Sequence, residues 1–178
     1  NPDGTTQSDD DFLTYAVIST NSLKAWESTL QSVRLLVIDR TQGTGHIVSI
    51  PNDVYAEVDS NAKTLADIYK DDGQSAFVSA LASVTNIKIT HVIIATDDVW
   101  EKISALSGSG ARSLVSNASS LLSSMITDMQ PNQLLELAEI VQPIGVSNLE
   151  HDEAPVVEGS SGTTVDPTAL GKLVGMLV

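Results

Sequence analysis

A predicted β-hairpin over residues 33–50 constrains the fold of this chain more than any other feature. The segment reads VRLLVIDRTQGTGHIVSI, with two apolar runs at 33–39 and 45–50 on either side of a Thr-Gln-Gly-Thr-Gly turn. Apolar, β-branched runs that flank a glycine-containing turn are typical of paired strands. The second run leads directly into a Pro-Asn-Asp corner at 51–53, where the proline ends the strand ladder. The chain is therefore expected to contain an antiparallel strand pair that ends in a polar corner.

Alternating strand and helix patterns occupy the rest of the chain. The run IKITHVIIA at 87–95 is the clearest strand, and its apolar second half suits a central strand covered on both sides. A further buried strand is expected at 12–19. Apolar residues at helical spacing and turn signals predict helices at 22–32, 62–70, 74–84, 98–106, 111–127, 131–141 and 167–177. Extended segments are expected at 55–58 and 146–157, and a Gly/Ser loop at 158–164. This alternation predicts an α/β sandwich in a single domain over 12–178, preceded by a disordered leader or linker at 1–11.

The composition excludes several classes of protein. The chain has 178 residues, with 23 acidic against 9 basic side chains and a formal net charge of −14. Such a balance repels polyanions, so we expect no nucleic-acid binding. Cysteine is absent, which removes disulfides and a thiol nucleophile. No apolar run in the sequence approaches the roughly 20 residues needed to cross a bilayer.

The three histidines, His46, His91 and His151, lie far apart in the sequence and lack metal-ligand spacing. His91 falls in the middle of the strand expected at 87–95, which favours a structural role over a catalytic one. The acidic run EHDE at 150–153 could hold a divalent cation weakly, but a solvated acidic loop is the favoured interpretation. We therefore predict no metal site.

Motifs for nucleophilic catalysis and nucleotide binding are absent. Neither a G-x-S-x-G string nor a P-loop occurs, and the serines at 113–124 belong to an expected helix with no obvious base. The stretch GSGAR at 108–112 places Arg112 at a helix start, where backbone N–H groups can hold an anion. A plain connector between helices is the favoured interpretation of that stretch.

The corner at 51–53 is the most specific polar feature. Polar side chains at a strand end lie where ligands bind in α/β folds. An Asx-type turn that simply ends the strand explains the same residues equally well. The pattern alone favours neither interpretation.

The order of these elements resembles the LytR-CpsA-Psr family of cell-envelope proteins. Three stretches carry the resemblance, namely SVRLLVIDRTQGTGHIVSIPNDVYAEV, YKDDGQSAFVSALASVTNIKITHVIIATDDVWEKISALSG and TDMQPNQLLELAEIVQPIGVSNLEHDEAPVV. In that family a strand pair ends in a Ser-Ile-Pro-Arg-Asp-like string, which residues 49–53 match here. The resemblance covers most of the chain and implies a central mixed β-sheet sandwiched by helices.

The resemblance also implies a cellular location and a binding partner. Members of the family are membrane-anchored with the domain outside the cytoplasm, bind polyprenyl-phosphate lipids and transfer glycopolymers onto peptidoglycan. They use arginines, acidic residues and a divalent metal around the pyrophosphate. We therefore expect an extracytoplasmic domain of a bacterial envelope, anchored through an upstream transmembrane segment outside this chain, whose partner is a polyprenyl-phosphate lipid or an envelope protein.

Departures from the family pattern predict that catalysis has been lost. Asn52 stands where the family has arginine, although Asp53 is kept, and the family's arginine-containing segment after the string matched by 103–108 is missing. Only Arg34, Arg40 and Arg112 occur in the whole chain. Three arginines are too few to converge on a pyrophosphate transition state. We expect a non-catalytic binding or adaptor domain with no catalytic residue and no cofactor.

The residues expected to bind a ligand are Arg34, Asn52, Asp53 and Lys63. One alternative is an active phosphotransferase that uses Asp53 and Lys63 with Mg²⁺. A second alternative is a structural adaptor in which the helix at 111–127 contributes an interface.

Overall fold

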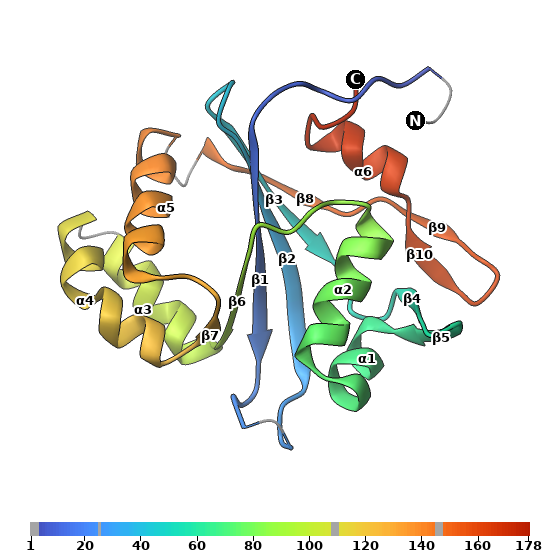
Figure 1. Ribbon diagram of the computed structural model, residues 1–178, viewed down its shortest axis with the longest axis horizontal. Helices are drawn as coiled ribbons and strands as arrows, with labels where there is room; N and C mark the ends of the chain where they lie inside the picture. Colours follow the sequence, from blue (N-terminus) through green and yellow to red (C-terminus); the bar gives the residue numbers. More distant parts are fainter. Residues whose placement is uncertain (1–3, 25, 108–110, 145–147) are drawn as a thin grey trace.

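A six-stranded mixed sheet forms the centre of the computed structural model, which describes residues 4–24, 26–107, 111–144 and 148–178. The strand order is β7-β6-β1-β2-β3-β8 (Figure 1). The strands are β1 (Phe12–Thr20), β2 (Leu30–Asp39), β3 (Thr44–Ile50), β6 (His91–Thr96), β7 (Ile126–Thr127) and β8 (Glu150–Glu153). β2 pairs antiparallel with both β1 and β3, whereas β6 and β8 pair parallel with β1 and β3. The expected hairpin and mixed sheet are confirmed.

Helices cover both faces of this sheet. They are α1 (Leu65–Asp72), α2 (Gln74–Thr85), α3 (Asp97–Ser107), α4 (Ala111–Ser123), α5 (Pro131–Ile144) and α6 (Pro167–Leu173). In Figure 1, α3, α4 and α5 lie on one side of the sheet, and α1, α2 and α6 lie on the other. Two small hairpins complete the fold, β4 (Tyr55–Val58) with β5 (Asn61–Thr64), and β9 (Val156–Glu158) with β10 (Thr163–Val165). The helices on both faces confirm the expected α/β sandwich.

The alternation of side chains along the strands divides the interior into two layers. Ala16 and Ile18 of β1 and Leu35 of β2 pack with α1, α2 and α6. Tyr15 and Ile38 of the same strands face the opposite layer and pack with α4 and α5. Successive strand residues point to opposite faces of a sheet, so two continuous apolar strands can supply both layers.

The prediction of a helix at 22–32 is wrong. This segment forms turns that connect β1 to β2, and β2 already begins within it. The Asn21 side chain accepts a hydrogen bond from the Thr29 amide at 2.7 Å, and the Ser28 hydroxyl bonds the Tyr69 hydroxyl at 2.7 Å. Asn and Ser side chains that bond the backbone or a distant partner in this way compete with helix formation. They hold a compact connection between two adjacent antiparallel strands.

Two helix boundaries on either side of the sheet also differ from the expectation. The helix expected at 62–70 begins at Leu65, because residues 61–64 pair with β4 and the Thr64 hydroxyl caps α1 by accepting from the Asp67 amide at 3.2 Å. The helix expected at 111–127 ends at Ser123, and the residues that follow add β7 to the edge of the sheet.

The C-terminal part is more finely divided than expected. The extended segment expected at 146–157 contains β8 and β9, while its residues 146 and 147 lie outside the described ranges. The loop expected at 158–164 is shorter, because Glu158 belongs to β9 and Thr163 and Thr164 belong to β10, which leaves 159–162 as the turn of the hairpin. The last helix ends at Leu173 rather than continuing to 177.

The two ends of the described chain lie side by side (Figure 1). The Thr6 amide donates to the Val178 carbonyl at 2.8 Å, and the Val178 amide donates back to the Thr6 carbonyl at 2.9 Å. Gln7 forms a β-bridge with Leu177. Part of the segment at 1–11 is therefore held against the C-terminal end of the domain. No helix of the described ranges has the length and apolar character required to span a membrane.

Candidate functional site

An apolar pocket lies between the sheet and the layer formed by α3, α4 and α5. Its volume is about 510 Å³, within the usual range of ligand pockets. The apolar lining from the strands is Tyr15, Val17, Leu36, Ile47 and Ile93, and that from the helical layer and its connections is Trp100, Leu122, Met125, Met129, Leu134 and Leu137. The pocket has the apolar wall that a hydrocarbon ligand requires.

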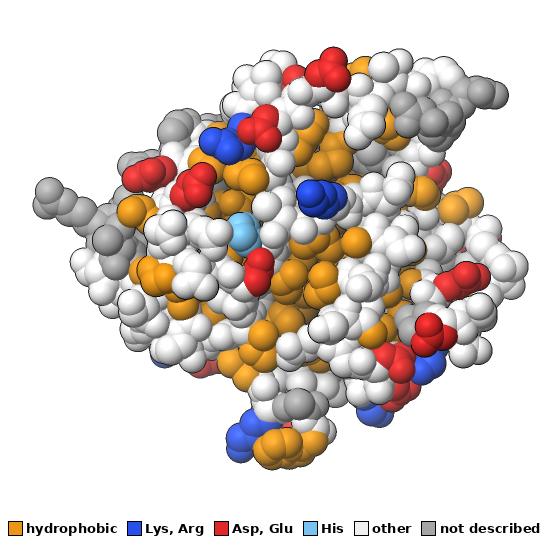
Figure 2. Space-filling model, viewed as in Figure 1, with side chains coloured by type: hydrophobic (Ala, Val, Ile, Leu, Met, Phe, Trp, Pro, Cys, Tyr) orange, Lys and Arg blue, Asp and Glu red, His pale blue; other side chains and the backbone are white. Residues whose placement is uncertain are grey.

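The pocket is open because the helices leave part of the sheet uncovered. Val17, Leu36 and Ile47 are only half-buried, although they lie on three strands inside the sheet. Leu36 and Ile47 are direct partners in the β2–β3 ladder. Figure 2 shows hydrophobic side chains exposed between the two helical layers. An exposed apolar surface of this kind often marks a binding site.

Polar side chains reach the same pocket from three neighbouring strands. Arg34 of β2 lies opposite Ser49 of β3 in the strand register, and His151 of β8 lies beside Ile47. Arg34 and His151 are exposed, while Ser49 is half-buried. An arginine beside an apolar wall can bind an anionic group while the wall contacts an attached hydrocarbon. The pocket is thus suited to an amphipathic anion.

One wall of the pocket is held by an aromatic contact and a hydrogen bond. The Tyr15 ring stacks on the His91 ring with 5.8 Å between the ring centroids, and the His91 Nδ1 lies 2.8 Å from an Asp128 carboxylate oxygen. Burial raises the pKa of Tyr15, and the nearby Glu136 carboxylate adds to the effect. Tyr15 therefore stays neutral at physiological pH and acts as an apolar wall rather than as a phenolate.

The structure separates the four residues expected to bind a ligand. Arg34 lines the apolar pocket, whereas the other three are not among its lining residues. The Asn52 side-chain amide donates to the Leu30 carbonyl at 3.4 Å, and the Asn52 backbone carbonyl accepts from the Ala66 amide at 2.9 Å. Asn52 therefore connects the end of β3 to the starts of β2 and α1.

Asp53 and Lys63 lie elsewhere on the surface. Asp53 is exposed in the turn after β3. Lys63 of β5 donates to Asp72 at 3.1 Å and lies 3.9 Å from Asp71. The hydrogen bond to Asp72 raises the pKa of Lys63. Lys63 is consequently engaged with acidic side chains of α1.

The corner after β3 offers Asp53 as a carboxylate ligand for a divalent metal. Among the residues described, the group of three or more potential metal ligands is His46, Glu150 and Asp152, and Asp53 is not part of it. Mg²⁺ is usually held by one or two carboxylates together with phosphate oxygens of a substrate. Asp53 would be the protein ligand of such a site, so the alternative with an active phosphotransferase stays a prediction.

Two residues of the pocket, Ser49 and His151, were not among the expected ligand-binding residues. The signal for Ser49 is its position two residues before Pro51, on the face of β3 opposite Val48. His151 was expected in an acidic loop, but residues 150–153 form a strand parallel to β3. The strand places His151 on the pocket face and its two acidic neighbours on the other face.

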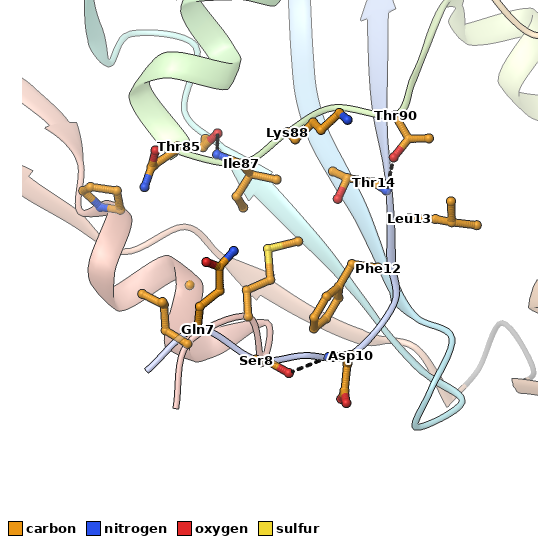
Figure 3. A pocket seen from close by; sticks show the side chains of 15 residues that line it. Gln7, Ser8, Asp10, Phe12, Leu13, Thr14, Thr85, Ile87, Lys88 and Thr90 are labelled. Carbon is orange, nitrogen blue, oxygen red and sulfur yellow. Dashed lines mark hydrogen bonds between the residues drawn. The ribbon is translucent and has the colours of Figure 1, made fainter. Parts of the chain in front are cut away.

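A second cavity lies where the N-terminal segment, the α2–β6 connection and α6 meet (Figure 3). Its volume is about 460 Å³. Along its wall the Thr14 amide donates to the Thr90 hydroxyl at 3.0 Å, and the Asp10 amide donates to the Ser8 hydroxyl at 3.2 Å. Among the described residues, Lys88 is the one basic residue of its lining. Ser8 and Thr90 already accept hydrogen bonds from neighbouring backbone amides, and the apolar pocket beside Arg34 is the stronger candidate site.

The fold is similar to solved structures of LytR-CpsA-Psr-type proteins. The transcriptional regulator YvhJ from Bacillus subtilis is 14% identical with a TM-score of 0.68, and the match covers 93% of this chain and 95% of that chain. TagV from B. subtilis is 11% identical with a TM-score of 0.69, over 93% and 95% of the two chains. TagT bound to LI-WTA is 11% identical with a TM-score of 0.59, over 93% and 91%. No protein-family model and no curated protein matches the chain. The likeness therefore establishes the fold of this chain.

Proposed function

We propose that this protein is a non-catalytic lipid-binding domain on the extracytoplasmic side of a bacterial envelope. Its ligand is a polyprenyl-phosphate lipid, with the first isoprene units in the apolar pocket and the phosphate at Arg34. The observation that carries the proposal is the position of Arg34 at the edge of a pocket whose other lining is almost entirely apolar. TagT, whose fold is similar, was solved with LI-WTA bound.

The energetics of the pocket favour this class of ligand. Each methylene that leaves water for an apolar wall contributes about 0.8 kcal/mol. A charge-assisted hydrogen bond between an arginine and a phosphate adds orientation as well as affinity. A neutral sugar offers little apolar surface to this wall and no charge to Arg34.

The proposal of lost catalysis rests on the number and engagement of the cations. Arg40 lies 3.5 Å from Asp11, and Lys63 bonds Asp72. Among the residues whose side chains the structure describes, Arg34 is the one lysine or arginine that lines the pocket. The stretch at 108–110 and the side chain of Arg112 lie outside the described part of the structure. One arginine can bind a phosphate, but stabilising the charge that develops during pyrophosphate cleavage requires several converging donors.

Calorimetry with a short-chain polyprenyl phosphate tests this function. We expect saturable binding, which weakens about tenfold in Arg34→Gln because one charge-assisted contact is lost. Lys63→Gln is the matched control, since it removes a cation outside the pocket and should leave the affinity unchanged. The matching polyprenol, which lacks the phosphate, should bind the wild type and Arg34→Gln equally.

Other results would replace the proposal. No saturable binding of the polyprenyl phosphate would leave an envelope-protein adaptor as the better function. Equal affinity of the wild type and Arg34→Gln would exclude the assigned phosphate position. Mg²⁺-dependent turnover of a lipid pyrophosphate that Asp53→Ala abolishes would establish the active transferase instead.

A further inference from the structure

Three potential metal ligands meet on the face of the sheet opposite the apolar pocket. His46 lies near the start of β3, and Glu150 and Asp152 lie on β8. The parallel register places His46 opposite Glu150 and Val48 opposite Asp152, so all three side chains fall on one face. One ligand atom from each residue lies within 4.8 Å of the others. The fold thus joins residues that are about a hundred positions apart in the sequence.

The separations within this group differ from those of hydrogen bonds. The His46 Nδ1 lies 3.4 Å from a Glu150 carboxylate oxygen and 3.7 Å from an Asp152 carboxylate oxygen. Charge-assisted N–H···O bonds are about 2.7–2.9 Å long. Two atoms that bind one tetrahedral zinc ion at about 2.1 Å lie roughly 3.4 Å apart. The two separations exceed hydrogen-bond length and lie within a few tenths of an ångström of the spacing between two zinc ligands.

Burial gives a second and independent indication. Within the described residues, the His46 Nδ1 and one Asp152 carboxylate oxygen are both inaccessible to solvent and make no hydrogen bond, although they face each other at 3.7 Å. The His46 side chain is only 16% exposed, and the Asp152 side chain is 35% exposed. Buried polar atoms without a partner are rare in proteins, because each one loses its contacts with water. A cation between the two atoms would satisfy both.

We propose that His46, Glu150 and Asp152 form a binding site for a divalent first-row transition metal, with Zn²⁺ as the best fit. An imidazole nitrogen with two carboxylates is a ligand set that zinc accepts, whereas Ca²⁺ and Mg²⁺ prefer oxygen ligands alone. Glu150 is 70% exposed, which leaves a side open for a water ligand. The site lies at the opposite end of β3 from the corner at 51–53, and it does not depend on the proposed lipid.

Such a cation would link the edge strand β8 to its neighbour β3. β8 is a strand of four residues at the sheet edge, and β3 is its neighbour in the sheet. His151 lies between the two acidic ligands in the sequence but points to the opposite face, into the apolar pocket. A metal bridge from β3 to β8 would therefore fix the strand that carries this part of the pocket wall.

The test is calorimetry with Zn²⁺ on tag-free protein that has been treated with a chelator. We expect one saturable site, at least tenfold weaker in His46→Gln and in Asp152→Asn, each of which removes one ligand. Glu153→Gln is the matched control, because it neutralises a carboxylate of the same strand on the opposite face and should leave the affinity unchanged. Mg²⁺ and Ca²⁺ should bind more weakly than Zn²⁺. Circular dichroism verifies that each variant is folded.

Two results would overturn the site. One is the absence of saturable Zn²⁺ binding to the wild type, which would make the group a simple ion pair of His46 with two carboxylates. The other is binding that is equal in the wild type, His46→Gln and Asp152→Asn, which would indicate an adventitious ion only. If one variant fails to fold, the other still decides the question.

Discussion

Asp128 accepts hydrogen bonds from two consecutive residues of β6, with the His91 Nδ1 at 2.8 Å from one carboxylate oxygen and the Val92 amide at 2.8 Å from the other. The contact joins β6 to the segment that follows β7. Partial burial opposes ionisation of the carboxyl group, but the bonds from the Val92 amide and the His91 ring together hold the pKa of Asp128 below its ordinary value.

This contact should make the free energy of unfolding decrease as the pH falls into the acidic range. Because the folded-state pKa of Asp128 is lowered, its contribution is present above the unfolded value near pH 4 and is lost as the pH falls through the folded value. In Asp128→Asn the free energy of unfolding at pH 7 should fall by on the order of 1 kcal/mol, given that the group is half exposed. Urea unfolding between pH 2.5 and 7 should give a shallower decline for the variant. If the wild type and Asp128→Asn lose stability equally as the pH falls, Asp128 is not the source of this pH dependence.

Filling the apolar pocket should block the lipid without unfolding the protein. Val17 is half-buried and lines the pocket beside Arg34. In Val17→Trp the larger side chain has open space to occupy, so we expect polyprenyl-phosphate affinity to fall more than tenfold while the melting temperature changes little. Val78→Trp, on α2 at the other face of the sheet, is the control and should leave the affinity unaltered. Normal affinity of Val17→Trp would place the ligand elsewhere.

Two large aromatic residues, Phe77 of α2 and Trp26 of the β1–β2 connection, should differ greatly in the cost of truncation. Phe77 is fully buried and meets Tyr69 edge to face with 5.5 Å between the ring centroids, so Phe77→Ala should cost about 3–5 kcal/mol of stability. Trp26 is 80% exposed in the β1–β2 connection, and Trp26→Ala should change stability by less than about 0.5 kcal/mol. Chemical denaturation measures both. A large effect at Trp26 would favour the helical segment with a buried face that the sequence predicted.

A glycine in the β9–β10 turn should tolerate no side chain. Gly162 has φ +141°, and a Cβ there would lie 2.6 Å from the Tyr55 ring. Gly162→Ala should therefore destabilise the protein by roughly 1–3 kcal/mol, from strain together with displacement of the ring. Gly43 also has a positive φ, +68°, but a Cβ there meets nothing within 4 Å. Gly43→Ala should cost less, and equal losses in urea unfolding would show that the Tyr55 contact is unimportant.

The elements that could be predicted from sequence are those whose pattern is local. The strands on either side of the Gly43 turn follow from apolar runs and a glycine that adopts a positive φ. The segment 22–32 was misread because a few apolar residues at helical spacing fit a short helix by chance. What decides its structure is a pair of distant contacts, the Ser28 bond to Tyr69 and the Asn21 bonds across the turn. Ser28 and Tyr69 are 41 positions apart, so no local stretch of sequence contains both residues of that contact.

The candidate site was only partly predictable for the same reason. Arg34 could be selected as one of three arginines, but the apolar wall beside it comes from four strands and three helices and needs the sheet order. His46 and Asp152 carry no recognisable spacing in the sequence, because their contact depends on a parallel pairing across the sheet edge. The resemblance to a family predicted the mixed sheet. The polar corner at 51–53 led to the prediction of Asn52 and Asp53 as ligand-binding residues, although neither lines the pocket.

The reciprocal pair of backbone bonds between Thr6 and Val178 has a mechanical consequence. Because the two ends meet at one point, a short peptide could join them, and a new opening in the β1–β2 connection at the far end of β1 should give a circularly permuted chain with the same fold. A pulling force applied between the present ends would be borne first by that pair. The force would reach the six-stranded sheet only after these two hydrogen bonds had broken. Tension would therefore release the terminal segments before it disturbed the pocket.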